Sequence, residues 1–184
     1  MPARNALSRA LRLLTLAAML GTSIAHADTS VESYAEVNQL LRTGKTAEAI
    51  ARADSYLAGN ARDPQMRFLK GVAQTDAGQT ADAIATFTQL VEEYPELAEP
   101  YNNLAVIYAK QGDLDKTRVA LEMAVRNNPT YAVAHENLGD IHARLAYQSY
   151  VRAQELDARV ATSVRPKLVQ LRSLLQPAAP AAKK

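Results

Sequence analysis

The chain has 184 residues, of which 48% are hydrophobic, with 21 Lys and Arg, 19 Asp and Glu and no Cys. This length predicts one domain with a sizeable core, and the absence of cysteine excludes disulfides, thiol catalysis and thiolate metal sites. The basic excess lies in the segment 1–27, which contains no acidic residue, so the net charge gives no argument for a nucleic-acid partner.

The segment 1–27 has the three zones of a secretory signal peptide. Three Arg residues precede a nearly continuous apolar run over residues 13–24, and Ala25 and Ala27 are small residues at the positions that a signal peptidase reads. An uncleaved membrane anchor is an alternative, although a spanning helix needs roughly 20 apolar residues; a mitochondrial presequence is another. We expect cleavage before Asp28, export to the periplasm of a bacterium, and no stable membrane insertion afterwards.

A regular period of about 34 residues organises the chain that follows. Gly44, Gly78 and Gly112 are spaced by this interval, and so are Pro95 and Pro129. Each glycine stands in a polar turn that leads into a helix, where glycine supplies the positive φ that ends the preceding helix. Because repeats of this length are supersecondary units that stack on each other, the sequence predicts an array of helix pairs.

The third copy shows the two helices of a unit most clearly. One helix face joins Tyr101, Leu104, Ala105 and Tyr108, which recur at the spacing of an α-helix. A second helix is expected to end at residues 127–129, where proline prevents its continuation and disfavours helical angles for the preceding residue.

These residues resemble the tetratricopeptide repeat family, whose helix–turn–helix units have the same period. The third copy matches the family pattern at Tyr101, Leu104, Ala105, Tyr108, Gly112, Ala124 and Pro129, and the second copy matches at Gly71, Gly78, Ala83, Phe87 and Pro95. The resemblance implies an all-α superhelix, an α-solenoid of about three and a half repeats with a C-terminal capping helix. These motifs are specific for the fold and say little about function.

The resemblance divides the mature chain, residues 28–175, into successive parts. We expect repeats at about residues 30–63, 64–97 and 98–131, an irregular fourth unit at 132–158, a capping helix at 163–175 and a disordered tail at 176–184. Small side chains at Gly71, Ala83, Ala105 and Gly139 are expected to let paired helices approach closely.

The fourth unit lacks the five residues that contain the turn glycine. We therefore predict that its two helices fuse into one, with a single stripe along Leu138, Ile141, Leu145, Ser149, Ala153 and Leu156; the alternative is a sharp break near residues 143–144.

In the capping helix, Ser163 is expected to be the N-cap and Pro166 to lie in the first turn. The expected apolar stripe of this helix is Val164, Leu168, Leu171 and Leu175.

No residue pattern indicates catalysis, a cofactor or a metal site. His135 and His142 lack the spacing of helical zinc ligands and are expected at aromatic-like core or interhelix positions. Glu136 and Asp140 are interpreted as a solvated helix face, on which Arg144 supplies one favourable ion pair. A basic stripe with interleaved aromatic residues, typical of nucleic-acid binding, is also absent from the sequence.

By resemblance to the family, a partner would bind in the concave groove lined by the first helix of each unit. The resemblance maps this groove onto Tyr34, Asn38, Leu41, Phe68, Val72, Thr75, Asn102, Asn103, Val106, Lys110, Glu136, Asn137 and Asp140.

Asn103 and Asn137 match the position at which peptide-binding members of the family place asparagine. An asparagine side chain can hold a peptide amide with its donor and its acceptor, although asparagine is also common at solvated helix starts. Phe68 would give an apolar anchor for a side chain of the guest. A clamp for an acidic C-terminus is not expected, because Lys110 has few basic neighbours in the groove.

The sequence therefore predicts a non-catalytic scaffold or adaptor that binds an extended peptide or a helix of a partner protein in the bacterial envelope. The alternative is a structural protein that self-associates, with the groove or an end face filled by another copy. In that case the weak first repeat and the stripe of Leu168, Leu171 and Leu175 would form the joint.

Overall fold

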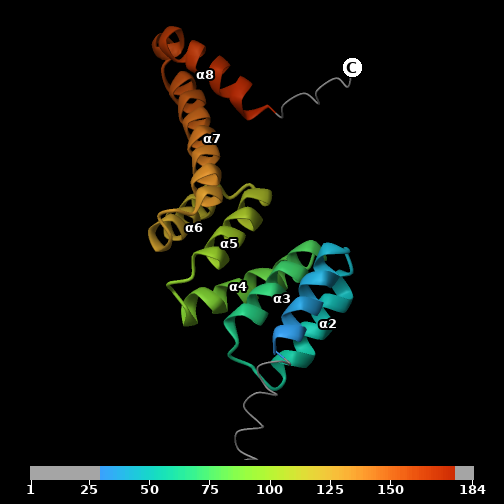
Figure 1. Ribbon diagram of the computed structural model, residues 1–184. Coiled ribbons are helices and arrows are strands. Elements are labelled where there is room, and N and C mark those ends of the chain that lie inside the picture. The colour runs from blue at the N-terminus through green and yellow to red at the C-terminus, as the bar shows by residue number, and fades with distance from the viewer. Residues whose placement is uncertain (1–29, 177–184) are drawn as a thin grey trace, which may run out of the picture. The chain divides into compact units, whose positions relative to one another are not determined.

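The computed structural model describes residues 30–176, which form helices and contain no strand (Figure 1). The expected signal peptide and nearly all of the expected tail lie outside the described residues. The chain divides into two compact units, the first ending at Gln79 and the second beginning at Thr80. None of the helices within the described range has the length and apolar content that a membrane crossing requires.

The first unit contains a helix over residues 30–42, α2 (Thr46–Leu57) and α3 (Pro64–Asp76). α3 begins at a proline preceded by an aspartate, which is a favourable helix start. The Asp63 carboxylate accepts a hydrogen bond from the Met66 N–H at 2.9 Å. This cap satisfies one backbone donor that the first turn of the helix leaves unpaired.

The core of the first unit combines small residues of α2 with larger residues of its neighbours. Ala49 and Ala53 are completely buried, and the small side chains allow the helices to approach closely. The cluster consists of Val37, Ala49, Ala53, Met66, Leu69 and Ala73.

The second unit contains α4 (Thr80–Glu93), α5 (Ala98–Lys110), α6 (Leu114–Asn127), α7 (Ala132–Leu156), η1 (Ala158–Val160) and α8 (Ala161–Leu175). Each helix packs on the next one along the chain (Figure 1). Leu104, Ala105, Leu121 and Ala124 are buried where α5 and α6 face each other. As the sequence predicted, the residue before Pro129 is extended and α6 ends there.

The three glycines of the repeat period form the same turn. All three have φ between 72° and 79°, which confirms the expected left-handed conformation. In the last of these turns, the Gly112 N–H donates to the Ala109 carbonyl and the Asp113 N–H to the Tyr108 carbonyl. The turns at Gly44 and Gly78 repeat this pair of hydrogen bonds, which is the Schellman ending of a helix.

The fourth repeat has no such turn, and α7 is one uninterrupted helix, as the missing glycine predicted. Its first half packs on α6 and buries Ala134 and Ile141, whereas no residue between 142 and 156 is buried. The expected apolar stripe is therefore wrong at two positions, because Ser149 and Leu156 are exposed. The second half of α7 packs chiefly against α8.

Gly139 also departs from the expectation for a helix-packing position. It is exposed, and a methyl group added there would meet nothing within 4 Å. The equivalent residue of the third unit, Ala105, is 1% exposed because α6 folds back onto α5. Fusion of the two helices removes the partner that Gly139 would need.

α8 covers the second half of α7 with the predicted stripe. Val164 is buried, and Leu168, Leu171 and Leu175 are half-buried. The expected helix start is wrong, because Asp157 caps the η1 turn and α8 begins at Ala161. The Ser163 hydroxyl donates to the Val160 carbonyl from inside the first turn, and Pro166 lies beyond that turn, within the helix.

Candidate partner-binding site

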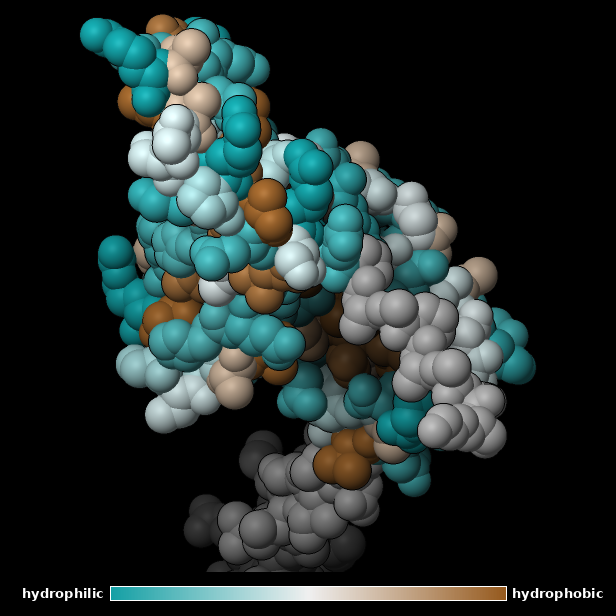
Figure 2. Space-filling view, turned by 90° about the horizontal axis from the view of Figure 1, so that it is seen from above, coloured by the Kyte–Doolittle hydropathy of each residue, from teal (hydrophilic) through white to brown (hydrophobic). Residues whose placement is uncertain are grey.

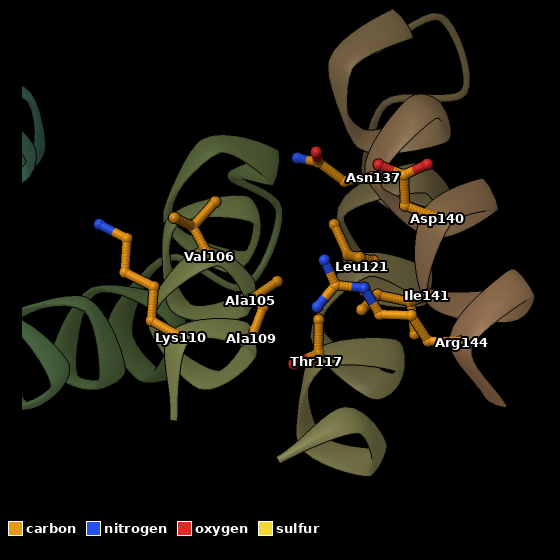
Figure 3. A pocket seen from close by; sticks show the side chains of 10 residues that line it. All are labelled: Ala105, Val106, Ala109, Lys110, Thr117, Leu121, Asn137, Asp140, Ile141 and Arg144. Carbon is orange, nitrogen blue, oxygen red and sulfur yellow. The ribbon is translucent and has the colours of Figure 1, made fainter. Parts of the chain in front are cut away.

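A hollow opens between α5, α6 and α7 of the second unit, with a volume of about 350 Å³ (Figure 3). Its lining consists of Ala105, Val106, Ala109, Lys110, Thr117, Leu121, Asn137, Asp140, Ile141 and Arg144. Four of these residues, Val106, Lys110, Asn137 and Asp140, are positions that the family resemblance assigned to the groove. The hollow is therefore the part of the expected groove that the structure brings together within one unit.

The floor of the hollow is apolar and well packed. Leu121 and Ile141 are 1% and 4% exposed, which fixes their side chains between the helices. Ala105 and Ala109 stand one turn apart on α5, so their small side chains leave space above this floor. The one polar group here, the Thr117 hydroxyl, donates to the Asp113 carbonyl at 2.7 Å. An apolar group of a guest would therefore meet an apolar surface that is already formed.

The rim of the hollow carries the charged side chains of Lys110, Asp140 and Arg144, each at least partly exposed. Within residues 30–176, the hydrogen bonds and ion pairs include none that joins these three groups. The expected ion pair between the acidic face of α7 and Arg144 is thus not formed. Figure 3 shows the Arg144 side chain reaching toward α6, while Lys110 extends away from α7.

Asn137 is linked to the neighbouring first helix. Its amide N–H donates to the Asn102 side-chain oxygen at 2.9 Å, which joins α7 to α5 beside the hollow. Asn102 is only 7% exposed, so the prediction that it lines the groove is wrong and its role is to hold the two helices together. Asn137 keeps its side-chain oxygen and a second N–H for other hydrogen bonds.

Asn103 and Glu136 do not line the hollow, and their assignment to the groove stays a prediction. The Asn103 amide donates to the Glu99 carbonyl at 2.9 Å, one turn back on its own helix. Asn38 makes the same bond to the Tyr34 carbonyl at 2.8 Å. The expected pair of Asn103 and Asn137 is therefore not a matched pair, because only Asn137 lines the hollow.

The expected groove residues of the first unit stabilise that unit. The Tyr34 hydroxyl donates to the Asp63 carboxylate, which also accepts from the Tyr56 hydroxyl at 3.1 Å. Burial, together with the hydrogen bond to Asp63, raises the pKa of the Tyr34 phenol above its usual range. This cluster ties the first helix to the capped start of α3.

Phe68 packs against the hydrophobic cluster of the first unit, together with Leu41. The expectation of a free apolar anchor at Phe68 is therefore replaced by a packing role. The Thr75 hydroxyl donates to the Gly71 carbonyl on its own helix at 2.9 Å, and Val72 is half-buried.

The two histidines are exposed, so neither takes the core position that was one of the two expectations for them. A ring nitrogen of His135 lies 3.0 Å from the Pro129 carbonyl oxygen. Among the residues described by the structure, no group of three or more His, Cys, Asp or Glu is placed to hold a metal ion.

Sequence reasoning assigned four of the ten lining residues to the groove and missed the other six. Ala109 and Arg144 follow Ala105 and Asp140 by four residues, so the helix period could have found them. Thr117 and Leu121 come from α6, a second helix, and the expected groove was restricted to first helices. Thr117 and Leu121 line the hollow because α6 packs against both α5 and α7.

Comparison with known proteins agrees with the repeat pattern. Two tetratricopeptide repeat models match residues 34–98 and 74–145. The TPR repeat-containing protein YvcD of Bacillus subtilis is 32% identical over 103 residues, which is 53% of this chain and 19% of that protein. The chloroplastic tetratricopeptide repeat domain-containing protein PYG7 of Arabidopsis thaliana is 43% identical over 49 residues, 27% of this chain and 16% of that protein. The chain thus spans less than a fifth of the length of these curated relatives.

Solved structures of similar fold cover most of the chain. The thermophilic TPR protein TTC0263 of Thermus thermophilus has a TM-score of 0.58 at 22% identity, over 78% of this chain and 81% of that one. MamA from Desulfovibrio magneticus has a TM-score of 0.54 at 21% identity, over 79% of this chain and 76% of that one. The structure of Naa15/Naa10 bound to HypK-THB matches with a TM-score of 0.56 at 14% identity, over 79% of this chain and 21% of that one. At these identities the likeness concerns the fold.

Proposed function

Because the chain belongs to the tetratricopeptide repeat family, whose fold supports protein–protein interaction, we propose that it is a non-catalytic adaptor. It holds an extended peptide segment or a helix of a partner protein in the hollow between α5, α6 and α7. The observation that carries this proposal is the combination of a formed apolar floor and a polar rim whose three charges are not used inside the unit.

The size of the hollow suits side chains of a guest. A volume of about 350 Å³ lies at the lower end of the range for binding pockets, about 300–1,000 Å³. An apolar side chain would rest on Leu121 and Ile141, while the free acceptor and donor of Asn137 would bind a backbone amide. The hollow therefore fits a short part of a longer guest.

The charges of the rim favour an internal segment over a terminal carboxylate. Lys110 and Arg144 are basic, but Asp140 precedes Arg144 by one turn and would repel a carboxylate in the same place. The guest we expect carries an apolar residue flanked by polar or oppositely charged residues. Under this proposal, hydrogen bonds from Asn137 to the peptide backbone contribute to the affinity.

We place this adaptor in the bacterial envelope. The support is the signal-like segment of residues 1–27, with its basic start, apolar run and small residues before Asp28. Under this proposal, Lys110 and Arg144 meet a partner that is itself exported or anchored in a membrane.

The alternative function is a structural protein that fills its own groove with another copy. The stripe expected as the joint, Leu168, Leu171 and Leu175, is half-buried in a helix that packs on α7. This packing weakens the alternative in that form, and the open hollow favours a guest from another protein.

A pull-down from envelope extract with the full chain tests the adaptor. Ala109→Leu fills the hollow from α5, and Asn103→Ala is the matched control on the same helix outside the hollow. We expect a protein that binds the unchanged chain and Asn103→Ala and is lost with Ala109→Leu. If Ala109→Leu retains the same proteins as the unchanged chain, the hollow is not the binding site.

A further inference from the structure

The charges of the second unit are divided between its two ends. The segment 80–109 contains five carboxylates and no Lys or Arg, whereas the segment 158–176 contains four basic residues and no carboxylate. The acidic residues are Asp82, Glu92, Glu93, Glu96 and Glu99, and the basic ones are Arg159, Arg165, Lys167 and Arg172. Arg159 is paired with Asp157, which stands directly before the second segment, so the basic character of α8 comes from Arg165, Lys167 and Arg172.

A second hollow lies at the acidic end, between α4, α5 and α6. Its volume is about 430 Å³, and it shares no lining residue with the hollow between α5, α6 and α7. Most of its lining is apolar or aromatic, with Val91, Tyr101, Leu104, Tyr108, Val119 and Met123 as the main contributors. Val119 is 51% exposed, so an apolar side chain of the lining is open to solvent.

Charged side chains stand at the edge of this hollow. The Lys116 ammonium lies 2.9 Å from the Asp113 carboxylate and 5.6 Å above the Tyr108 ring. Asp115 lines the same edge, and Glu92 follows the lining residue Val91 on α4 and is exposed. The hollow is thus apolar inside, with carboxylates at its border.

The basic end carries exposed apolar side chains on a helix that is held in place. Val169 and Leu174 of α8 are 64% and 67% exposed. The Arg172 guanidinium donates to the Tyr147 hydroxyl at 3.0 Å, and the Lys167 ammonium lies 5.0 Å from the centre of the Tyr150 ring, so α8 is fixed on α7 from two sides. Figure 2 shows brown, apolar patches scattered over a largely hydrophilic surface.

We propose that α8 of one copy docks in the hollow between α4, α5 and α6 of a second copy, head to tail. Val169 enters the apolar hollow, and Arg165, one turn before it on the same side of α8, faces the carboxylates at its border. The match rests on complementarity of both charge and apolar surface. Because donor and acceptor surfaces differ, the contact is heterologous and builds chains or a ring rather than a closed two-fold dimer.

The occupant of the hollow comes from another molecule. Within one chain α8 packs on α7 and η1 rather than on α4, α5 or α6, and the uninterrupted α7 separates these elements (Figure 1). The second half of α7 has no buried residue, so a neighbouring copy would also give this weakly packed end an additional contact.

A second copy fits α8 better than an anionic lipid surface does. The side of α8 turned away from α7 carries exposed Thr162, Pro166, Val169 and Ser173 and a single cation, Arg165. Lys167 and Arg172 are held at the tyrosines of α7, so α8 presents no continuous row of cations to a membrane. Polybasic lipid-binding segments place about 4–8 cations at the surface.

Sedimentation velocity of the full chain over a range of concentrations measures the contact. The arm variant, named for α8, is Val169→Glu, and the hollow variant is Val119→Arg, which adds a cation where the basic helix docks. Both positions are at least half exposed, so the fold is retained, and circular dichroism checks this. Val133→Arg, at a residue 50% exposed on the first turn of α7, is the matched control.

We expect the unchanged chain and Val133→Arg to self-associate, and the arm and hollow variants each to weaken association by about tenfold or more. Mixing the two variants should restore a one-to-one pair, because one contributes an intact hollow and the other an intact α8. Self-association that Val119→Arg leaves unchanged, or a mixture that stays monomeric, overturns the proposal.

A chain that is monomeric at every concentration also overturns it. A second experiment measures binding of the chain to vesicles with and without anionic lipid. Binding of the monomer to anionic vesicles that is lost with the arm variant would assign α8 to a membrane surface instead. The adaptor proposal is independent, because the Ala109→Leu variant leaves both α8 and the second hollow unchanged.

Discussion

The third and fourth repeats start from similar sequences and end in different structures. In the third, Gly112 turns the chain and α6 returns along α5, so Ala105 is 1% exposed. In the fourth, the turn is missing, α7 runs on, and Gly139 at the equivalent position is exposed with nothing near it. A family motif residue therefore takes its family role only when the turn that brings its partner helix is also present.

The largest expected effect distinguishes the packed third repeat from the exposed end of the fourth repeat. Leu121→Ala should lower the free energy of unfolding by about 2–5 kcal/mol, since this side chain is 1% exposed and its loss leaves a cavity. Leu156→Ala, at a residue 70% exposed at the end of α7, should change it by less than about 0.5 kcal/mol. Urea denaturation followed by circular dichroism measures both changes. Equal losses of unfolding free energy would contradict the difference between the two repeats.

The turn itself gives the next effect. Gly112 has a φ of 79°, which an alanine adopts at a cost of about 1–2 kcal/mol. Gly112→Ala should lower the free energy of unfolding by that amount. Gly59→Ala is the control, since Gly59 is not among the glycines with positive φ. A Gly112→Ala protein as stable as the control would mean that the turn does not depend on glycine.

Gly139→Ala is expected to act in the opposite direction. Alanine has the higher helix propensity, and nothing lies within 4 Å of the added methyl group. The substitution should therefore raise the free energy of unfolding by about 0.5–1 kcal/mol. Thermal unfolding of the full chain tests this sign, and a loss of stability would reveal a helix packed against this face of α7.

The first repeat has the turn at Gly44 and, in addition, the Tyr34–Asp63 hydrogen bond. The pKa of the Tyr34 phenol is raised by burial and by that bond, so the folded state favours the neutral phenol. Its stabilising effect is complete below the pKa of an unfolded tyrosine, about 10, and declines as the pH rises above it. Tyr34→Phe should flatten this alkaline decline of stability, which denaturation at successive pH values measures. An unchanged slope would assign the decline to other groups.

Much of the fold was predictable because it depends on local chemistry. The glycine turns, the proline end of α6 and the fused α7 each follow from residues that are close together in sequence. Ser163 misled the prediction of the last helix start because a competing cap, Asp157, stands a few residues earlier and begins the η1 turn.

The candidate site was less predictable because its residues are brought together by packing. Val106, Lys110, Asn137 and Asp140 followed from the repeat register. The bond between Asn102 and Asn137 joins residues 35 apart, which is one more than the period, so the register gave no signal for it. In the first unit the expected groove residue Tyr34 donates a hydrogen bond to Asp63, which lies 29 positions away in the sequence.

The central claim, that the hollow between α5, α6 and α7 holds a partner protein, is tested most directly by site-specific photo-crosslinking in living cells. A photoreactive residue replaces Val106 in the lining or, as a control, Val133 on the outer side of α7. The account predicts a covalent adduct with a partner protein from position 106 and none from position 133. Adducts from both positions alike, or from neither, would contradict it.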